Sequence, residues 1–232
     1  MISAVVFDLY GTLVGAPPVD SYAAYAAGTA TRLGFDPLKF PPIYDADYEG
    51  RQTGRFGTHE QYLRDLAQRL GVRLSESQLT ALVQFRVDTV RSWLIVKPDA
   101  VSTLRSLRAR GLRLGLVSDC GWETGLIWPS LSVAPLIDVP VLSYEVGVKK
   151  PNPRIFEIAV ERLGVPPGQC LYVGDGGSDE LAGARRAGMV PIMIDDPKDA
   201  VGHRPGYVAW SGPRIASLAE LLSRRELGAR GG

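Results

Sequence analysis

The 232-residue sequence predicts an α/β fold, in which a doubly wound parallel sheet carries an inserted all-helical cap domain. The apolar strand Ala4–Phe7 opens the chain, and residues 20–95 then show helical periodicity with no strand pattern. From Pro98 onward, helices alternate with short apolar strands, which is typical of a parallel sheet covered on both faces. We therefore expect a core of residues 1–15 and 96–232 and a cap of residues 16–95.

Helix boundaries support the prediction of a cap. Residues 16–20 contain two prolines and are typical of a hinge that leads out of the core. Residues 22–33 are rich in alanine, residues 59–70 carry apolar side chains at helical spacing, and each stretch ends at a glycine. Ser75 and Gln78 approximate a capping box, which marks the start of a third helix.

The core elements follow from the same kinds of signal. We expect helices over residues 99–110, 153–163, 178–187 and 215–225, and strands over residues 112–117, 139–143, 170–173 and 190–194. Three strands end on a polar residue before a turn, namely Asp8, Ser118 and Asp175. Since parallel strands end at one edge of a sheet, where open α/β sheets bind their ligands, these residues are expected to converge.

Composition excludes several classes of protein. The net charge of +1 offers no strong field for nucleic acid or an anionic membrane surface, and no apolar run is long enough to span a membrane. Two cysteines cannot build a disulfide framework, and two distant histidines make a zinc site improbable. Because Met1 lies almost directly before the first strand, we expect no signal peptide. We expect a cytoplasmic globular enzyme that is a monomer or a homodimer.

Two acids at neighbouring strand ends point to a metal. Adjacent carboxylates repel each other, which would raise the pKa of Asp8 or of Asp175 unless a cation lies between them. Mg²⁺ suits this position, because it takes oxygen ligands, needs few carboxylates and tolerates a substrate phosphate in its shell. The loop of residues 147–153 supplies a lysine that could complete such a site.

Four motifs in order resemble those of the haloacid dehalogenase-like hydrolases, a family of doubly wound (Rossmann-like) enzymes. The run Asp8-Leu9-Tyr10-Gly11-Thr12-Leu13 resembles the first motif, and Ser118-Asp119 resembles the second. Lys150-Pro151-Asn152-Pro153 is similar to the third motif, and Gly174-Asp175-Gly176-Gly177-Ser178-Asp179-Glu180 to the fourth. The long helical stretch between the first and second motifs is similar to members with a helical cap.

The resemblance implies a catalytic role for Asp8. In such an enzyme Asp8 is the nucleophile that forms an aspartyl-phosphate, and Lys150 orients it and neutralises charge. Asp8 and Asp175 would hold Mg²⁺ together with the backbone carbonyl of Tyr10. The implied substrate is a small-molecule phosphate ester of unspecified identity.

The same resemblance implies supporting roles for five further residues. Thr12, Ser118 and Asp119 would contact the phosphoryl group or brace the loops around it. The family's second acid of the fourth motif lies five positions after the first, which here is Glu180. Asp179 is adjacent to it, and either could reach the metal through water.

Tyr10 departs from the pattern of the family's phosphatases, which carry a second Asp at this position as a general acid and base. Tyrosine occurs there in the 2-haloacid dehalogenases, which need no metal, whereas Asp175 favours a phosphatase. Phe156 also replaces the tyrosine that dehalogenases typically place after the lysine of the third motif. The favoured prediction is a Mg²⁺-dependent phosphatase; the alternatives are a metal-independent 2-haloacid dehalogenase and a weakly active binding or regulatory protein.

Three further residue predictions concern the cap and its surroundings. Arg51 and Arg55 lie one helical turn apart, so both could face an anionic substrate, although a solvated surface pair is the commoner arrangement. His59 is expected at the surface near the start of a helix. Cys120 follows the second motif and is expected to be an inert, partly buried thiol.

Overall fold

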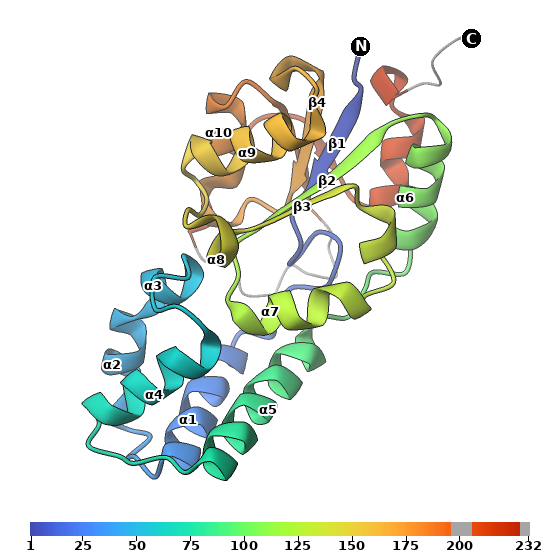
Figure 1. Ribbon diagram of the computed structural model, residues 1–232. Helices are drawn as coiled ribbons and strands as arrows, with labels where there is room; N and C mark the ends of the chain where they lie inside the picture. The colour runs from blue at the N-terminus through green and yellow to red at the C-terminus, as the bar shows by residue number, and fades with distance from the viewer. Residues whose placement is uncertain (196–205, 228–232) are drawn as a thin grey trace.

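The computed structural model describes residues 1–195 and 206–227, and a six-stranded parallel sheet forms its centre (Figure 1). The strand order is β3-β2-β1-β4-β5-β6, and the predicted doubly wound α/β core is confirmed. The strands are β1 (Ala4–Phe7), β2 (Arg113–Ser118), β3 (Val139–Leu142), β4 (Cys170–Gly174), β5 (Val190–Ile194) and β6 (Arg214–Ile215).

The register of the central strands explains where the polar residues gather. Phe7 at the end of β1 pairs with Leu116 of β2 and with Val173 of β4. The residues that follow these positions therefore reach the same carboxyl edge of the sheet. The chain runs from β1 through β2 to β3 on one side and then crosses to β4 on the other side of β1. This edge therefore lies at a topological switch point, where open α/β sheets bind ligands.

Helices cover both faces of the sheet because side chains of a strand alternate between its faces. Val5 and Phe7 pack with the cluster that includes α6 (Ala100–Ala109). Ala4 and Val6 pack with the cluster that includes α9 (Pro153–Leu163) and α10 (Glu180–Arg186). Strands buried on both faces read as continuous apolar runs, as residues 4–7 do.

Five helices lie together beyond the carboxyl edge of the sheet, three of them as expected, and we call residues 16–95 the helical insert (Figure 1). They are α1 (Ser21–Leu33), α2 (Phe40–Ala46), α3 (Tyr48–Gln52), α4 (His59–Arg69) and α5 (Glu76–Trp93). The predicted capping box of Ser75 and Gln78 starts α5, and Thr58 with Gln61 forms a second one at α4.

Two short helices outside the insert position residues of the site. The first, α7 (Trp122–Ile127), follows β2 and packs against α5 of the insert. The second, α8 (Ser143–Val146), directly follows β3 and contacts α3. Both lie between the sheet and the insert, so segments that follow β2 and β3 contact both parts of the molecule (Figure 1).

The prediction of a closing helix over residues 215–225 is wrong. Ile215 belongs to β6, and its backbone carbonyl accepts a hydrogen bond from the backbone N–H of Asp195. The 3₁₀ turns of Leu218–Ser223 follow. Pairing with the exposed edge of β5 outweighs the helical periodicity of this segment. The predicted helix of residues 178–187 begins at Glu180, after a 3₁₀ turn over Gly177–Asp179.

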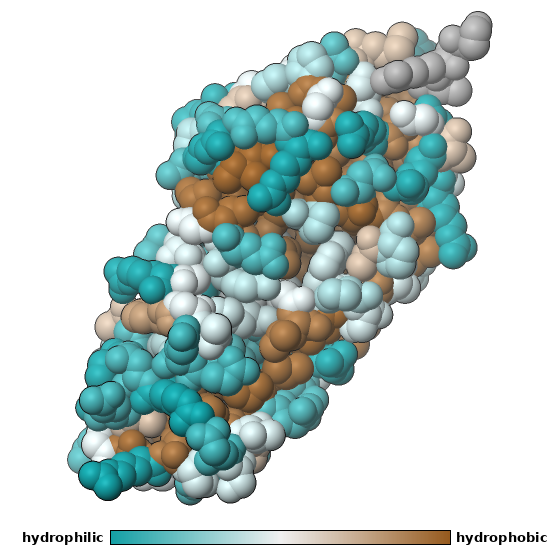
Figure 2. Space-filling view, viewed as in Figure 1, coloured by the Kyte–Doolittle hydropathy of each residue, from teal (hydrophilic) through white to brown (hydrophobic). Residues whose placement is uncertain are grey.

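The surface mixes polar and apolar side chains. Figure 2 shows hydrophilic residues over much of the visible face, with apolar stretches between them. None of the helices in the described ranges is both long enough and apolar enough to cross a lipid bilayer.

Candidate active site

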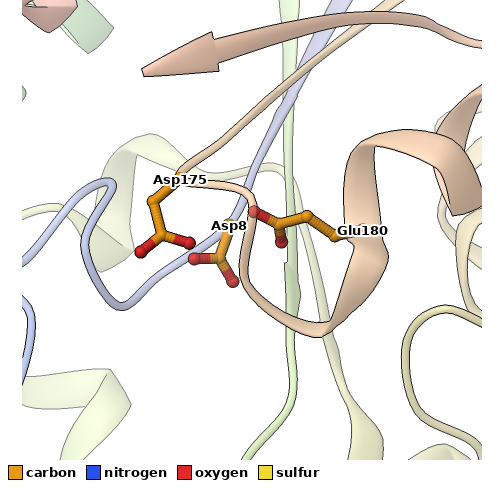
Figure 3. A group of neighbouring side chains, drawn as sticks. All are labelled: Asp8, Asp175 and Glu180. Atoms are coloured by element: carbon orange, nitrogen blue, oxygen red, sulfur yellow. The ribbon is translucent and has the colours of Figure 1, made fainter. Parts of the chain in front are cut away.

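Three acidic residues converge at the carboxyl edge of the sheet (Figure 3). Asp8 follows β1, Asp175 follows β4, and Glu180 is the first residue of α10. All three are buried, and one carboxylate oxygen from each lies within 4.8 Å of the others. Figure 3 shows the Asp8 carboxylate between those of Asp175 and Glu180.

Two glycines make room for this cluster. Gly11 has a φ of +71°, and a Cβ atom there would lie 2.3 Å from Asp175 Oδ2. A Cβ atom on Gly174 would lie 2.1 Å from Glu180 Oε1. Because real Cβ contacts are longer, these carboxylates can occupy their positions only beside glycine, and Gly11 also satisfies the left-handed backbone of the turn.

Lys150 lies within the acidic cluster. Its Nζ atom is 2.5 Å from Asp8 Oδ1 and 2.6 Å from Glu180 Oε2. Tyr172 donates a hydrogen bond to the same Glu180 oxygen at 2.7 Å, and the backbone N–H of Gly176 donates to Glu180 Oε1 at 3.0 Å. Glu180 is thus held by three donors, and it fixes the ammonium group of Lys150 beside Asp8.

Burial and charge shift the pKa values of this pair upward. Burial raises the pKa of the Asp8 carboxyl well above its usual value; Lys150 opposes the shift, while Glu180 and Asp175 add to it. Burial acts to lower the pKa of Lys150, but the charges of Asp8 and Glu180 outweigh it and hold that pKa well above its usual value. Lys150 is therefore a cation at any physiological pH, and Asp8 gains from a further positive charge nearby.

The donor set fits Mg²⁺. A buried cluster of carboxylate oxygens with only one lysine retains excess negative charge, which a divalent cation can offset. Glu180 is already committed to Lys150, Tyr172 and Gly176, so Asp8 and Asp175 are the carboxylates suited to contact the ion.

Glu180 and Asp179 differ in position, although the sequence placed both near the metal. Asp179 has a left-handed backbone with a φ of +48°, and its carboxylate lies 3.5 Å from Arg186 in a partly exposed pair. Glu180 is fully buried in the acidic cluster. Of the two, only Glu180 joins the cluster.

The three other predicted phosphate contacts lie at the carboxyl ends of β1 and β2. Thr12 is buried, and its hydroxyl donates to Asp8 Oδ2 at 3.4 Å. Ser118 is fully buried, and its Oγ atom has no hydrogen-bond partner among the described residues. Asp119 Oδ1 accepts a hydrogen bond from the backbone N–H of Lys150 at 2.9 Å, which ties the second motif to the third.

A cavity of about 330 Å³ opens onto this cluster. Asp8, Lys150 and Asp175 line it from the side of the sheet, with Asp119, and Tyr10 contributes one aromatic wall. The cavity volume is that of a small-molecule site. Residues of the insert line the opposite side, including Tyr22, Tyr25, Tyr44, Tyr48, Arg51, Gln52, Arg86, Val90 and Trp93.

Tyr10 presents a neutral phenol to this cavity. Its hydroxyl forms a hydrogen bond with the Thr124 hydroxyl of α7 at 2.8 Å. Burial raises the pKa of Tyr10 well above its usual value, so the phenol stays protonated near neutral pH. Tyr10 can donate a hydrogen bond in the site, but it cannot act as a base there.

A buried charge network beside the cavity, which the sequence patterns did not predict, joins the insert to α7. Arg86 of α5 is 1% exposed, and its Nη2 atom lies 2.6 Å from Glu123 Oε1. The Tyr25 hydroxyl donates to the same oxygen at 2.6 Å, and His59 Nε2 lies 3.1 Å from it. Burial opposes ionisation of Glu123, but Arg86, His59 and Tyr25 outweigh it and hold the pKa of Glu123 well below its usual value.

The predicted surface position of His59 is wrong. The imidazole is 3% exposed and stacks on the Trp122 ring, with ring centroids 5.6 Å apart. One signal of the network was present in the sequence, because Arg86 falls on the apolar stripe of α5 with Leu79, Leu82 and Val90. An arginine at a core position of a helix indicates a buried partner.

Arg51 and Arg55 separate in the structure. Arg51 is buried and lines the cavity, whereas Arg55 is exposed, with its guanidinium 5.2 Å from the Phe56 ring centroid. Cys120 is buried at the cavity wall, and burial raises the pKa of its thiol far above the usual value. This position fits the expectation of an inert thiol.

The chain is similar to known hydrolases over most of its length. Residues 2–188 match the family model of the haloacid dehalogenase-like hydrolases. Glyceraldehyde 3-phosphate phosphatase of Methanopyrus kandleri is 33% identical over 202 residues, which cover 84% of this chain and 84% of that protein. The chain therefore belongs to the haloacid dehalogenase-like hydrolases.

Solved structures agree on the fold. A phosphatase of this family from Thermococcus onnurineus is 25% identical, with a TM-score of 0.62 over 96% of this chain and 97% of that chain. A 2-haloacid dehalogenase from Pseudomonas syringae pv. Tomato DC3000 is 23% identical, with a TM-score of 0.65 over the same shares of the two chains. The fold is shared by phosphatases and dehalogenases alike, so the side chains of the site must distinguish the two activities.

Proposed function

We propose that this hydrolase is a Mg²⁺-dependent phosphatase that acts on a small phosphomonoester through an aspartyl-phosphate on Asp8. The observation that carries the proposal is the buried set of Asp8, Lys150 and Asp175 at the end of a cavity of about 330 Å³. The similarity to a named phosphatase over most of the chain supports it. A small-molecule phosphate ester is the proposed partner, the proposed location is cytoplasmic, and the protein is proposed to be a monomer or a homodimer.

Each residue has its own role in the proposed reaction. Asp8 attacks phosphorus, the bond between phosphorus and the ester oxygen breaks, and the leaving oxygen takes up a proton. Water then attacks the phosphorus of the aspartyl-phosphate, which releases inorganic phosphate and restores the Asp8 carboxylate. Lys150, held by Glu180, orients Asp8 and favours its ionised form.

Asp8, Asp175 and the backbone carbonyl of Tyr10 are proposed to hold the metal. When bound, Mg²⁺ screens the repulsion between an anionic phosphoryl group and the attacking carboxylate. The unpartnered Ser118 hydroxyl and the Thr12 hydroxyl are proposed to contact phosphoryl oxygens, and Asp119 braces the loop that carries Lys150. The helical insert, residues 16–95, acts as a cap that excludes bulk water during attack.

Tyr10 limits the leaving groups that the enzyme handles well. A phosphatase with a carboxylic acid in this position gains about 10² to 10⁴ from general acid–base catalysis. The neutral phenol of Tyr10 cannot replace the base function of that acid. We therefore propose that the enzyme favours esters whose leaving group is acidic or carries its own proton donor.

The alternative activity, metal-independent 2-haloacid dehalogenation, is favoured by Tyr10 alone. An acidic cluster of Asp8, Asp175 and Glu180 has no evident use when Asp8 attacks carbon and halide leaves. A purely binding or regulatory protein would have no use for a complete set of nucleophile, lysine and metal ligands.

The experiment that separates these activities measures phosphate release from p-nitrophenyl phosphate and chloride release from 2-chloropropionate. Each is measured with Mg²⁺ and with EDTA, for the wild type and for Asp8→Asn. Phosphate release that requires both Mg²⁺ and Asp8 supports the proposal. Chloride release that persists in EDTA would establish the dehalogenase instead, and a protein with neither activity and no Mg²⁺ affinity would be a binding protein.

A further inference from the structure

Arg51 carries unused hydrogen-bonding capacity at the cavity. Its Nη1 atom donates to the Tyr44 carbonyl and, at 3.4 Å, to the Tyr62 hydroxyl. Its guanidinium lies 3.5 Å from the centroid of the Tyr44 ring. The Nε and Nη2 groups donate to no described residue, and neither is among the fully buried unpartnered atoms, so both remain accessible where Arg51 lines the cavity.

Arg51 also lacks a carboxylate partner, unlike the other buried arginine of the cavity. Arg86 is neutralised by Glu123 at 2.6 Å. No ion pair joins Arg51, which is 6% exposed, to any acid of residues 1–195 or 206–227. Buried charges in proteins are normally paired, since an isolated one loses its hydration without compensation. The counter-charge of Arg51 is therefore expected to come from outside the chain.

We propose that Arg51 binds a second anionic group of the substrate, a carboxylate or a second phosphate, while the transferred phosphoryl group lies at Asp8. This inference rests on the proposed phosphatase function and specifies its substrate class. A planar guanidinium with two free donors suits the two oxygens of a carboxylate or phosphate. The cavity joins Arg51 to Asp8 and Lys150 in one volume of about 330 Å³, which suits a phosphorylated acid or bisphosphate of a few carbons.

Besides Asp8 and Asp175, three acids line the cavity and could oppose an anion, and two of them are already engaged. Glu123 pairs with Arg86, and Asp119 Oδ1 accepts the backbone N–H of Lys150. Asp45, the residue after Tyr44, is exposed and lines the cavity from α2. Asp45 forms no ion pair with Arg51, so it weakens the positive field of Arg51 without neutralising it.

The test compares matched substrates that differ only in the distal group. 3-Phosphoglycerate carries a carboxylate where glyceraldehyde 3-phosphate carries an aldehyde, and ribulose 1,5-bisphosphate adds a phosphate to ribulose 5-phosphate. For at least one pair, the wild-type enzyme with Mg²⁺ should show a kcat/KM for the more anionic member that is higher by about 10- to 100-fold. The pair with the larger ratio identifies the anion that Arg51 binds.

Arg51→Met should abolish this preference by lowering kcat/KM for the more anionic member only, mainly through KM. Arg51→Lys keeps the charge but loses the planar fork, so it should retain part of the preference. Arg55→Met is the matched control, because Arg55 lies four residues after Arg51 and is exposed. The kcat/KM ratios of this variant should equal those of the wild type. Asp45→Asn removes an opposing charge and should increase the preference.

Several results would overturn the inference. If the wild type has the same kcat/KM for both members of each pair, Arg51 only supports the fold. The same holds if Arg51→Met lowers kcat/KM equally for both members. If Arg51→Met does not fold, unchanged ratios in both Arg51→Lys and Asp45→Asn have the same meaning. Absence of Mg²⁺-dependent hydrolysis of p-nitrophenyl phosphate would instead refute the phosphatase itself, and with it this inference.

Discussion

Arg86 Nη2 and Glu123 Oε1 lie 2.6 Å apart, and this buried pair joins a helix of the insert to a helix that follows β2. The Glu123 carboxylate also meets His59 and Tyr25, both from the insert. Glu123, five positions after Ser118, thus contacts the residues of the insert that lie beside the cavity. The network joins α7, which lines the cavity, to three helices of the insert.

Glu123→Gln should destabilise the protein by about 3 to 5 kcal/mol near neutral pH, because it leaves Arg86 buried without its counter-charge. Urea unfolding of the wild type and the variant measures this difference. The folded-state pKa of Glu123 lies well below the usual 4.5, so the ionised group stabilises the fold above that value. The difference should shrink as the pH falls below 4.5 toward the folded-state pKa.

Glu161→Gln is the control for this measurement. Glu161 lies 2.6 Å from Arg154, as close as Glu123 lies to Arg86, but both residues are exposed. Exposed pairs contribute little to stability, so this variant should unfold at nearly the wild-type urea concentration. Equal effects of the two substitutions would contradict a special role for burial.

Gly11→Ala should weaken Mg²⁺ activation, because the new methyl group meets Asp175 Oδ2 at 2.3 Å and must displace that carboxylate. We expect the Mg²⁺ concentration for half-maximal phosphatase activity to rise by about tenfold or more, as for disturbed metal ligands. Gly111→Ala is the matched control, since Gly111 has a φ of +77° and no atom within 4 Å of a Cβ. Gly111→Ala should introduce a backbone strain similar to that of Gly11→Ala and leave Mg²⁺ activation unchanged.

Tyr10→Asp should restore a general acid and base to the site. The wild type is expected to hydrolyse p-nitrophenyl phosphate faster than an alkyl phosphate by about 10² to 10⁴, because the alkyl leaving group needs a proton. In the variant, the ratio of kcat for p-nitrophenyl phosphate to kcat for the alkyl phosphate should be smaller by about tenfold or more. Thr124→Val removes the hydroxyl partner of Tyr10 without adding an acid, and it should leave this ratio of kcat values unchanged.

The two thiols should resist modification in the folded protein. Burial raises the pKa of the Cys170 thiol to about 11 and that of Cys120 further, so neither is a thiolate near neutral pH. A colorimetric thiol reagent should react slowly with the native protein and rapidly with two thiols after denaturation. Rapid loss of one native thiol, accompanied by loss of activity, would identify Cys120 as accessible from the cavity.

The sequence was sufficient to predict the convergence of Asp8, Ser118 and Asp175. Each follows an apolar strand, and a parallel sheet brings the ends of such strands to one edge whatever lies between them. Lys150 could be assigned to the same edge through the resemblance of its motif. These predictions depend on local patterns and on the general geometry of α/β sheets.

The remaining features depend on contacts that local patterns do not encode. The Glu123 network brings together side chains from α1, α4, α5 and α7, none adjacent in sequence. Asp179 and Glu180 are adjacent and chemically similar, but Asp179 has a left-handed backbone and pairs with Arg186, whereas Glu180 lies in the cluster. The predicted last helix failed because an open sheet edge was available to Ile215.

The position of Glu123 outside residues 16–95 has a consequence for exchanging caps between relatives. A chimera that receives a foreign insert but keeps its own α7 would retain a buried glutamate without Arg86, His59 and Tyr25 to receive it. The transferable unit for redesigning substrate range is therefore the insert together with α7 (Trp122–Ile127), two segments that are separated by α6 and β2 in the chain.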